Sequence, residues 1–310
     1  MKRRWIFLPI IGLFLIGLIL GSFFDLQINA ALYNRNNAFG LTMAALGESP
    51  SYAFMAACGM GFALLLKEYK KWWQRVLFIL AIIVANGCCI YFQSNHIFDV
   101  NAFYRPELKY FGYIAGVGVA VLGNLAGYFL FKFSHLSKKQ ILAILIFALC
   151  LYLISVGINQ LTKSLMARPR YRFLADMGVV NQYYRNWWQN GREIKELYTN
   201  SPVYFPNGQL ITKEEFKSFP SGHMTNTCVI ILFAGMLPLI NKHIKMKSEW
   251  LILIATGYCV LLGFSRMLVG AHYLSDVCMG ALTPLLVAYV INEIFTIIYN
   301  KIPKEKPVDL

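Results

Sequence analysis

The chain has 310 residues, of which 57% are hydrophobic and only 14% are charged, and its formal net charge is +14. This composition is typical of a polytopic membrane protein and excludes an ordinary soluble domain with a single core. The positive charge does not indicate nucleic-acid binding, because the lysines and arginines fall in short clusters between apolar runs, a pattern that orients membrane helices.

The apolar runs predict an all-α integral membrane protein of about eight transmembrane helices, with a core helical bundle and one long extracytoplasmic loop. The runs are Trp5–Phe23, Tyr52–Leu66, Val76–Phe92, Tyr110–Phe131, Gln140–Leu161, Gly222–Ile240, Trp250–Phe264 and Ala271–Ile298. The second run is short for a crossing. The first could instead be a cleavable signal peptide, with Ile28–Ala30 resembling a processing site, but its length and the many later runs favour an uncleaved helix.

Basic residues in the short connections set the orientation of these helices. If the chain starts inside, eight crossings place all the short basic clusters in the cytoplasm, namely Lys67–Arg75, Lys132–Lys139, Lys242–Lys247 and Lys301–Lys306. Both termini are then cytoplasmic, and the segments Asp25–Pro50, Gln93–Lys109 and Lys163–Pro220 face outward. The last of these carries four basic residues within Lys163–Arg172. The orientation rule does not require them there, so we expect them to have a function at the outer face.

The stretch Ser265–Asp276, SRMLVGAHYLSD, lies between the last two apolar runs. Arginine, histidine and aspartate are costly at membrane depth and usually mark function there. If the last helix begins at about Ala271, His272 and Asp276 are four residues apart and share a face. The carboxylate could then orient the imidazole and leave its other nitrogen as base or nucleophile. The alternative is an interfacial pair that only caps a helix.

The segment Pro220–His223, PSGH, opens the sixth apolar run. The free N–H groups and the positive end of the helix dipole would face a bound anion there. Ser221 adds a hydroxyl donor, and Gly222 lets the backbone approach the anion closely. The alternative is a simple N-cap made by the serine, with His223 as an ordinary interfacial histidine.

These two segments and the beginning of the long loop are predicted to meet at one outer membrane boundary. Together they offer Lys163, Arg168, Arg170, Ser221, His223, Arg266, His272 and Asp276. Several cations with two histidines and one carboxylate suit a multiply charged anion, above all phosphate.

The three segments resemble the signatures of the type-2 phosphatidic acid phosphatase superfamily, which also includes the glucose-6-phosphatases and the vanadium haloperoxidases. PSGH is complete, and so is the signature Ser-Arg-x5-His-x3-Asp that ends at Asp276. The first signature departs from the pattern: Lys163 and Arg170 have the family spacing, but Tyr171 stands where proline is expected. The resemblance covers about Lys132–Ile298, and the composition of the long loop is typical of a bacterial source.

The resemblance implies that His272 attacks phosphorus and forms a phosphohistidine while Asp276 fixes its tautomer. It implies that His223 protonates the leaving oxygen and then activates water. The remaining phosphate-binding residues would be Lys163, Arg170, Ser221, Gly222 and Arg266. No metal or other cofactor is expected, because cationic side chains neutralise the phosphate and the cysteines lack zinc-type spacing.

Spacing also distinguishes the two arginines of the first signature. At about 100° per helical residue, position 170 returns to within about 20° of Lys163, whereas position 168 points about 140° away. Pro169 disfavours helix at Arg168, but long side chains can still converge on one anion. We therefore expect Arg170→Ala to abolish turnover and Arg168→Ala to leave at least about a tenth of it.

The sequence thus predicts one membrane domain over residues 1–310, with N-terminal helices in 1–131 and a phosphatase core in 132–298 that includes the loop 163–220. The expected substrate is a lipid phosphate of the phosphatidic acid, phosphatidylglycerophosphate or undecaprenyl diphosphate type, and the other expected partners are membrane lipids. A lipid phosphotransferase and a non-catalytic lipid or anion transporter are the alternatives. The aromatic residues of the loop suit either a lid at the headgroup layer or an ordinary folded loop.

Overall fold

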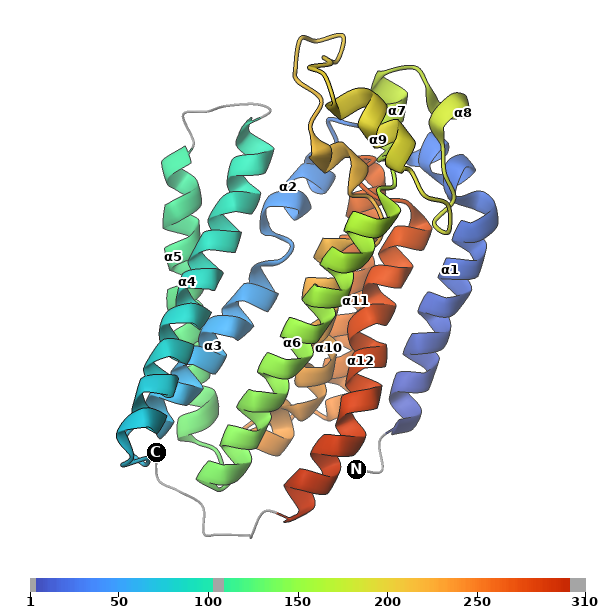
Figure 1. The fold of residues 1–310 in the computed structure, drawn as a ribbon. Coiled ribbons are helices and arrows are strands. Elements are labelled where there is room, and N and C mark those ends of the chain that lie inside the picture. Colours follow the sequence, from blue (N-terminus) through green and yellow to red (C-terminus); the bar gives the residue numbers. More distant parts are fainter. Residues whose placement is uncertain (1–3, 103–108, 302–310) are drawn as a thin grey trace. The chain divides into compact units, whose positions relative to one another are not determined.

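The computed structural model describes residues 4–102 and 109–301 (Figure 1). These residues form helices and turns, with no strand among them, so the predicted all-α fold is confirmed. The helices are α1 (Arg4–Leu32), α2 (Ala38–Leu46), α3 (Ser49–Leu65), α4 (Trp72–Ala102), α5 (Lys109–Lys132), α6 (Lys138–Met166), α7 (Tyr171–Asp176), α8 (Val180–Tyr183), α9 (Arg192–Thr199), the 3-10 helix η2 (Lys213–Phe216), α10 (Gly222–Ile240), α11 (Ser248–Leu268) and α12 (Leu274–Lys301).

Seven helices of the described chain are long and apolar enough to cross a membrane, namely α1, α4, α5, α6, α10, α11 and α12. The chain is therefore a multi-pass membrane protein. The remaining predicted run, Tyr52–Leu66, corresponds to α3, whose 17 residues span only about 25 Å at about 1.5 Å per residue. The hydrocarbon layer is about 30 Å thick, so α3 reaches across only where the bilayer thins or flanking side chains extend to the interface.

Three of the boundaries that differ from those predicted have a local explanation or fall at the edge of the described residues. Helix α1 runs past Asp25 to Leu32. This aspartate lies within the helix, is buried and pairs with Arg168, so it does not open a polar loop. Helix α4 continues to Ala102, and what remains of the predicted connection, 103–108, lies outside the described residues. Helix α12 begins at Leu274, because Gly270 adopts a left-handed φ of 63° after α11 and redirects the chain.

Packing divides the chain into two compact units. Of the described residues, unit 1 comprises 4–43, 154–228 and 258–286, and unit 2 comprises 44–102, 109–153, 229–257 and 287–301. All eight residues predicted for the site lie in unit 1.

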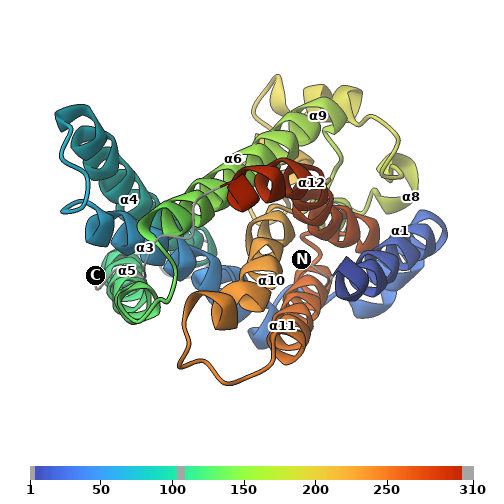
Figure 2. The same ribbon diagram turned by 90° about the horizontal axis from the view of Figure 1, so that it is seen from below.

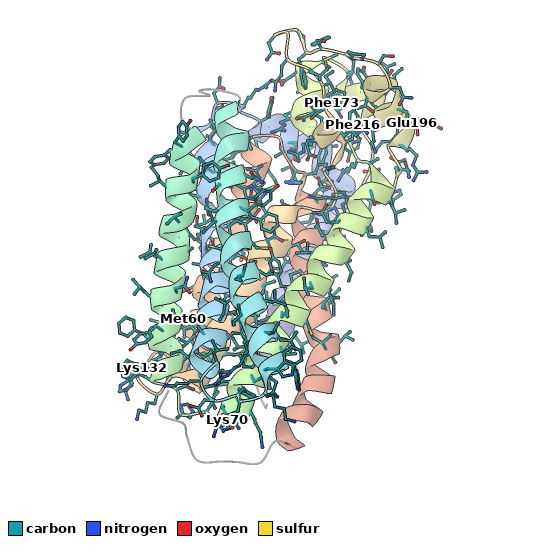
Figure 3. The ribbon with its side chains drawn as sticks, turned by 60° about the vertical axis from the view of Figure 1, so that its left-hand side comes forward. Met60, Lys70, Lys132, Phe173, Glu196 and Phe216 are labelled. Atoms are coloured by element: carbon teal, nitrogen blue, oxygen red, sulfur yellow. The ribbon has the colours of Figure 1, made fainter. Side chains whose placement is uncertain are left out.

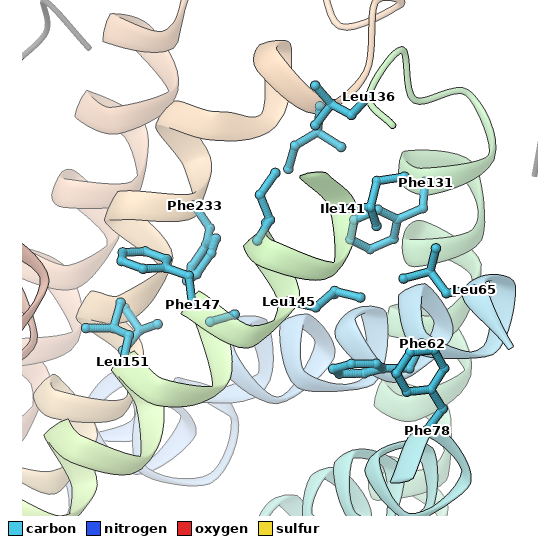
Figure 4. Close-up of a cluster of buried hydrophobic side chains, with 14 of the residues drawn as sticks. Phe62, Leu65, Phe78, Phe131, Leu136, Ile141, Leu145, Phe147, Leu151 and Phe233 are labelled. Atoms are coloured by element: carbon cyan, nitrogen blue, oxygen red, sulfur yellow. The ribbon is translucent and has the colours of Figure 1, made fainter. Parts of the chain in front are cut away.

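Unit 2 is built on the mutual packing of α3, α4 and α5, which lie side by side in both views of the ribbon (Figures 1 and 2). A second group of side chains in this unit forms an apolar core that includes Phe62, Leu65, Phe131, Phe147 and Phe233 (Figure 4). Every member of that buried core is hydrophobic.

The basic connections of unit 2 meet at one end of it. Lys70 and Lys132 lie at the same end (Figure 3), and Lys138 Nζ is 3.9 Å from a carboxylate oxygen of Glu68. The amide of Asn241, next to the third basic cluster, donates to the carbonyl of Phe129 at 2.9 Å. This arrangement agrees with one shared side for these three clusters. The residues from 302 onward, which hold most of the fourth basic cluster, lie outside the described chain.

The long connection between α6 and α10 is a folded layer that contains α7, α8 and α9 (Figure 1). It has its own apolar core, in which the rings of Phe173 and Phe216 lie 4.9 Å apart between centroids (Figure 3). Tyr183 and Tyr198 pack against this core. This packing favours the ordinary folded loop for these two tyrosines.

Candidate active site

The predicted site residues come from five helix ends of unit 1 and the connection between α11 and α12. Lys163 lies in the last turn of α6, and Arg170 is the N-cap of α7. Gly222 and His223 open α10, directly after Ser221. Arg266 lies in the last turn of α11, His272 in the connection that follows, and Asp276 in the first turn of α12. Helix α6 ends at Met166, so Lys163 and Arg170 do not share a continuous helical face as the spacing argument assumed.

The PSGH turn is held between α6 and α12. The N–H of Ser221 donates to the carbonyl of Asp276 at 2.9 Å, and the amide of Asn159 on α6 donates to Thr225 Oγ1 at 2.8 Å. A Cβ at Gly280 would lie 2.5 Å from the carbonyl oxygen of Ser221, so only glycine lets α12 approach this closely. The turn is therefore fixed before any ligand binds.

Ser221 presents a polar atom that the described protein does not satisfy. The residue is fully buried, and its Oγ has no hydrogen-bond partner among the residues that the structure describes. Buried hydroxyls are nearly always hydrogen-bonded, so an unsatisfied one at a helix N-terminus suits an anionic ligand.

Gly222 leaves space for a cation. A Cβ at this position would lie 2.9 Å from Nζ of Lys163, so a larger residue would push the ammonium away from the turn. Lys163 and the beginning of α10 thus meet, and both bring positive charge to the same point.

His272 is oriented differently from the prediction. Its Nδ1 lies 2.6 Å from the carbonyl oxygen of Ser218 and 3.8 Å from Oδ2 of Asp276. The pair is not carried by one helix as predicted, because α12 begins two residues after the histidine. A carbonyl only accepts hydrogen bonds, so the proton of the neutral ring is on Nδ1 and Nε2 keeps its lone pair.

Asp276 acts on the histidine through Ser218. One carboxylate oxygen accepts from the hydroxyl of Ser218 and from the N–H of Tyr273, the latter at 2.9 Å. The N–H of Ser218 donates to the carbonyl of Arg168 at 3.1 Å. Sequence reasoning missed Ser218, although it lies only three residues before Ser221.

The electrostatics of the site keep His272 neutral. Burial lowers the pKa of His272 to about 3, and the positive charges of Arg170 and Lys163 act in the same direction, against the opposing effect of Asp276. The cations therefore lie near enough to the imidazole to act on it. Arg266 supports the same segment, since its carbonyl accepts from the N–H of Ala271 at 3.0 Å and from that of His272 at 3.3 Å.

Arg168 lies in a position that its helical spacing did not predict. It is fully buried, and its guanidinium contacts Oδ1 of Asp276 at 2.5 Å and Oδ2 of Asp25 at 2.9 Å. It also lies 4.0 Å from the ring centroid of Tyr273. Breaking such a buried pair is strongly destabilising, so Arg168→Ala is expected to affect folding as well as turnover. The sequence feature that could have indicated this pairing is Asp25, a charged residue within a long apolar helix.

Taken together, these residues can bind a phosphoryl group and attack it. Lys163, Arg170 and Ser221 supply positive charge and donors, and His272 supplies a neutral ring with one free lone pair. His223 lies half-buried in the first turn of α10, next to Gly222.

A family model described as the PAP2 superfamily matches residues 140–299, about half of the chain, and this range contains all eight predicted site residues. Phosphatidylglycerophosphatase B of Bacillus subtilis (strain 168) is 35% identical over 92 residues, which cover 28% of this chain and 43% of that protein. The similarity thus spans less than half the length of this relative. No solved structure gave a significant match.

Proposed function

This chain belongs to the PAP2 superfamily, and from that premise we propose that it is a membrane phosphatase that hydrolyses a lipid phosphate. The observation that carries the proposal is the placement of His272, whose Nδ1 is bound to the Ser218 carbonyl while Nε2 remains available beside two cations.

In the proposed reaction, Nε2 of His272 attacks phosphorus and the bond from phosphorus to the lipid oxygen breaks. His223 gives a proton to that leaving oxygen, so the lipid departs as a neutral alcohol or as a lipid monophosphate. Water then attacks the phosphohistidine, His223 takes a proton from the water, and inorganic phosphate leaves. Lys163, Arg170, Arg266, Ser221 and the N–H of Gly222 stabilise the charge on the phosphoryl oxygens, so the proposed chemistry needs no metal.

The proposed substrate class is a phosphate or diphosphate carried by a lipid. Phosphatidylglycerophosphate is the first candidate because a relative is named a phosphatidylglycerophosphatase. Phosphatidic acid and undecaprenyl diphosphate carry the same reacting group and remain candidates.

The test is phosphate release by the purified protein from each of these three lipids, with His272→Ala as the matched inactive control. We expect release from at least one lipid, inhibition by vanadate and full activity in EDTA. Transfer of the phosphoryl group to an added alcohol with no free phosphate would instead identify a phosphotransferase. Binding without any turnover would identify a transporter, and loss in EDTA that one divalent ion restores would refute metal independence.

We further propose that α3 completes eight crossings, that the site faces outward and that both termini are cytoplasmic, because the basic connections of unit 2 lie together at one end. A cysteine at the exposed position of Asn200 should react with an impermeant thiol reagent in intact cells, whereas one at the exposed position of Lys245 should not. The reverse pattern would place the chemistry in the cytoplasm.

A further inference from the structure

Helix α1 lies outside the family match, yet it belongs to the same compact unit as the candidate active site. A stripe of residues on α1, spaced at every fourth position, contacts the beginning of α12 and the candidate site. The residues of this stripe are Gly17, Gly21, Asp25 and Asn29. Residues four apart on a helix lie on one face, so the stripe forms a continuous ridge.

The two glycines bring α1 into direct contact with the beginning of α12. A Cβ at Gly17 would lie 2.5 Å from Sγ of Cys278, and one at Gly21 would lie 2.6 Å from the backbone nitrogen of Ser275. The approach of the two helices therefore depends on the missing side chains.

Because the two helices lie this close, the carboxylate of Asp25 contacts Ser275 at the beginning of α12. Its Oδ1 accepts from the N–H of Ser275 at 3.0 Å, and its Oδ2 accepts from the Ser275 hydroxyl and from Arg168 at 2.9 Å. One turn later, the amide of Asn29 donates to the carbonyl of His272 at 3.2 Å. Asp25 and Asn29 are both buried.

The group formed by Asp25, Arg168 and Asp276 contains two carboxylates and one guanidinium. Arg168 contacts both Asp25 and Asp276, so the three residues together carry a formal charge of about −1, whereas Arg168 and Asp276 alone would be neutral. Phosphorylation of His272 makes its ring cationic. The excess negative charge then favours the intermediate, and it depends on Asp25.

We propose that α1 is part of the active site and that Asp25 and Asn29 are positioning residues for the pair His272 and Asp276. The proposal rests on the proposed phosphohistidine chemistry. It assigns a role in the reaction to a helix that the family match does not include.

The test compares Asp25→Asn with the unsubstituted protein on whichever lipid phosphate the latter hydrolyses. We expect kcat to fall at least about tenfold while KM stays within about twofold, because Asp25 does not touch substrate. In the double variant with Asp276→Asn, kcat should equal that of Asp276→Asn alone within about twofold, because both act on one counter-charge. Ser22→Ala is the matched control on α1: it removes a hydrogen bond to Trp187 and should keep kcat within about twofold.

Parental kcat in a folded Asp25→Asn protein, or fully additive losses in the double variant, would overturn the proposal. If Asp25→Asn does not fold, Asn29→Ala decides, since it removes only the amide contact to His272. A loss of about threefold or more in kcat at unchanged KM is expected, and parental kcat would refute the role of α1.

A readout without turnover separates this inference from the proposed function. In protein with 15N-labelled histidine, the His272 signal, assigned with His272→Gln, should report a proton on Nδ1 at neutral pH. We expect Asp25→Asn to shift this signal and Ser22→Ala to leave it unchanged. An unsubstituted protein with no turnover on any lipid phosphate would refute the proposed function, while the NMR comparison would still decide whether α1 acts on His272.

Discussion

The two units of this protein bury charged side chains to different degrees. The core of unit 2 around Phe147 and Phe233 is wholly apolar. Unit 1 instead buries Asp25, Arg168 and Asp276 together with His272. Removing charges from water costs several kcal/mol per ion unless they are paired. Unit 2 also buries a charged residue, Glu48, which accepts from the hydroxyl of Tyr52. The closer gathering of charged residues around one histidine in unit 1 distinguishes the candidate site.

The largest effect is expected when the proposed nucleophile of unit 1 is removed. His272→Ala should lower turnover by about four orders of magnitude or more, because no other residue of the proposed site takes up the phosphoryl group. Asp276→Asn should cost about 10²–10⁴-fold, as expected for an orienting carboxylate. Phosphate release by the two purified variants measures both effects. His272→Ala with turnover near that of the parent would reject the assignment.

A second substitution tests the cost of buried charge directly. Arg168→Ala leaves Asp25 and Asp276 buried without their counter-ion and should destabilise the protein by about 3–5 kcal/mol. This replaces the expectation from spacing that a tenth of the activity survives. Arg170→Ala should abolish turnover with little change in stability, because Arg170 is only half-buried. Chemical unfolding in detergent and kinetics on the same samples measure both. Equal stability of the two variants would contradict the assignment of Arg168.

Unit 2 offers the matching substitution in an apolar core. Leu145 is 1% exposed within that core, and Leu145→Ala should cost about 2–4 kcal/mol through the cavity that it leaves. Its kcat per folded molecule should remain within about twofold of the parent, because no site residue belongs to unit 2. Unfolding curves and turnover of one preparation suffice. A large loss of kcat with unchanged KM would show that unit 2 also shapes the site.

The smallest expected effect is on the pH profile. With its pKa lowered to about 3, His272 stays neutral at pH 5, so turnover should not fall between pH 7 and pH 5 as it would for a histidine with the ordinary pKa of about 6.5. In the unfolded chain the ring takes up a proton below about pH 6.5, so its contribution to stability is complete above that pH and is lost as the pH falls toward about 3. An acid limb near pH 6.5 would contradict the buried, neutral ring.

The sequence was sufficient for the parts of the site whose spacing is local. PSGH and the stretch that ends at Asp276 are short motifs, and the all-α membrane fold follows from apolar runs that neighbouring residues define. The contact between His272 and the Ser218 carbonyl could not be predicted, because it depends on how the folded layer returns the chain to α10. The start of α12 was misplaced because the left-handed turn at Gly270 is a backbone property that the apolar pattern does not record.

The ion pair between α1 and Arg168 also constrains how the protein is made. Asp25 and Arg168 are 143 residues apart in the chain, and Ser275 is 250 residues away from Asp25. At a synthesis rate of about 5–20 residues per second, Arg168 is made roughly 7–30 s after Asp25. An ionised carboxylate is costly in lipid, so α1 is expected to enter the membrane with Asp25 protonated or still near the interface. The packing of α1 is then completed late in biogenesis, only after α12 has been made.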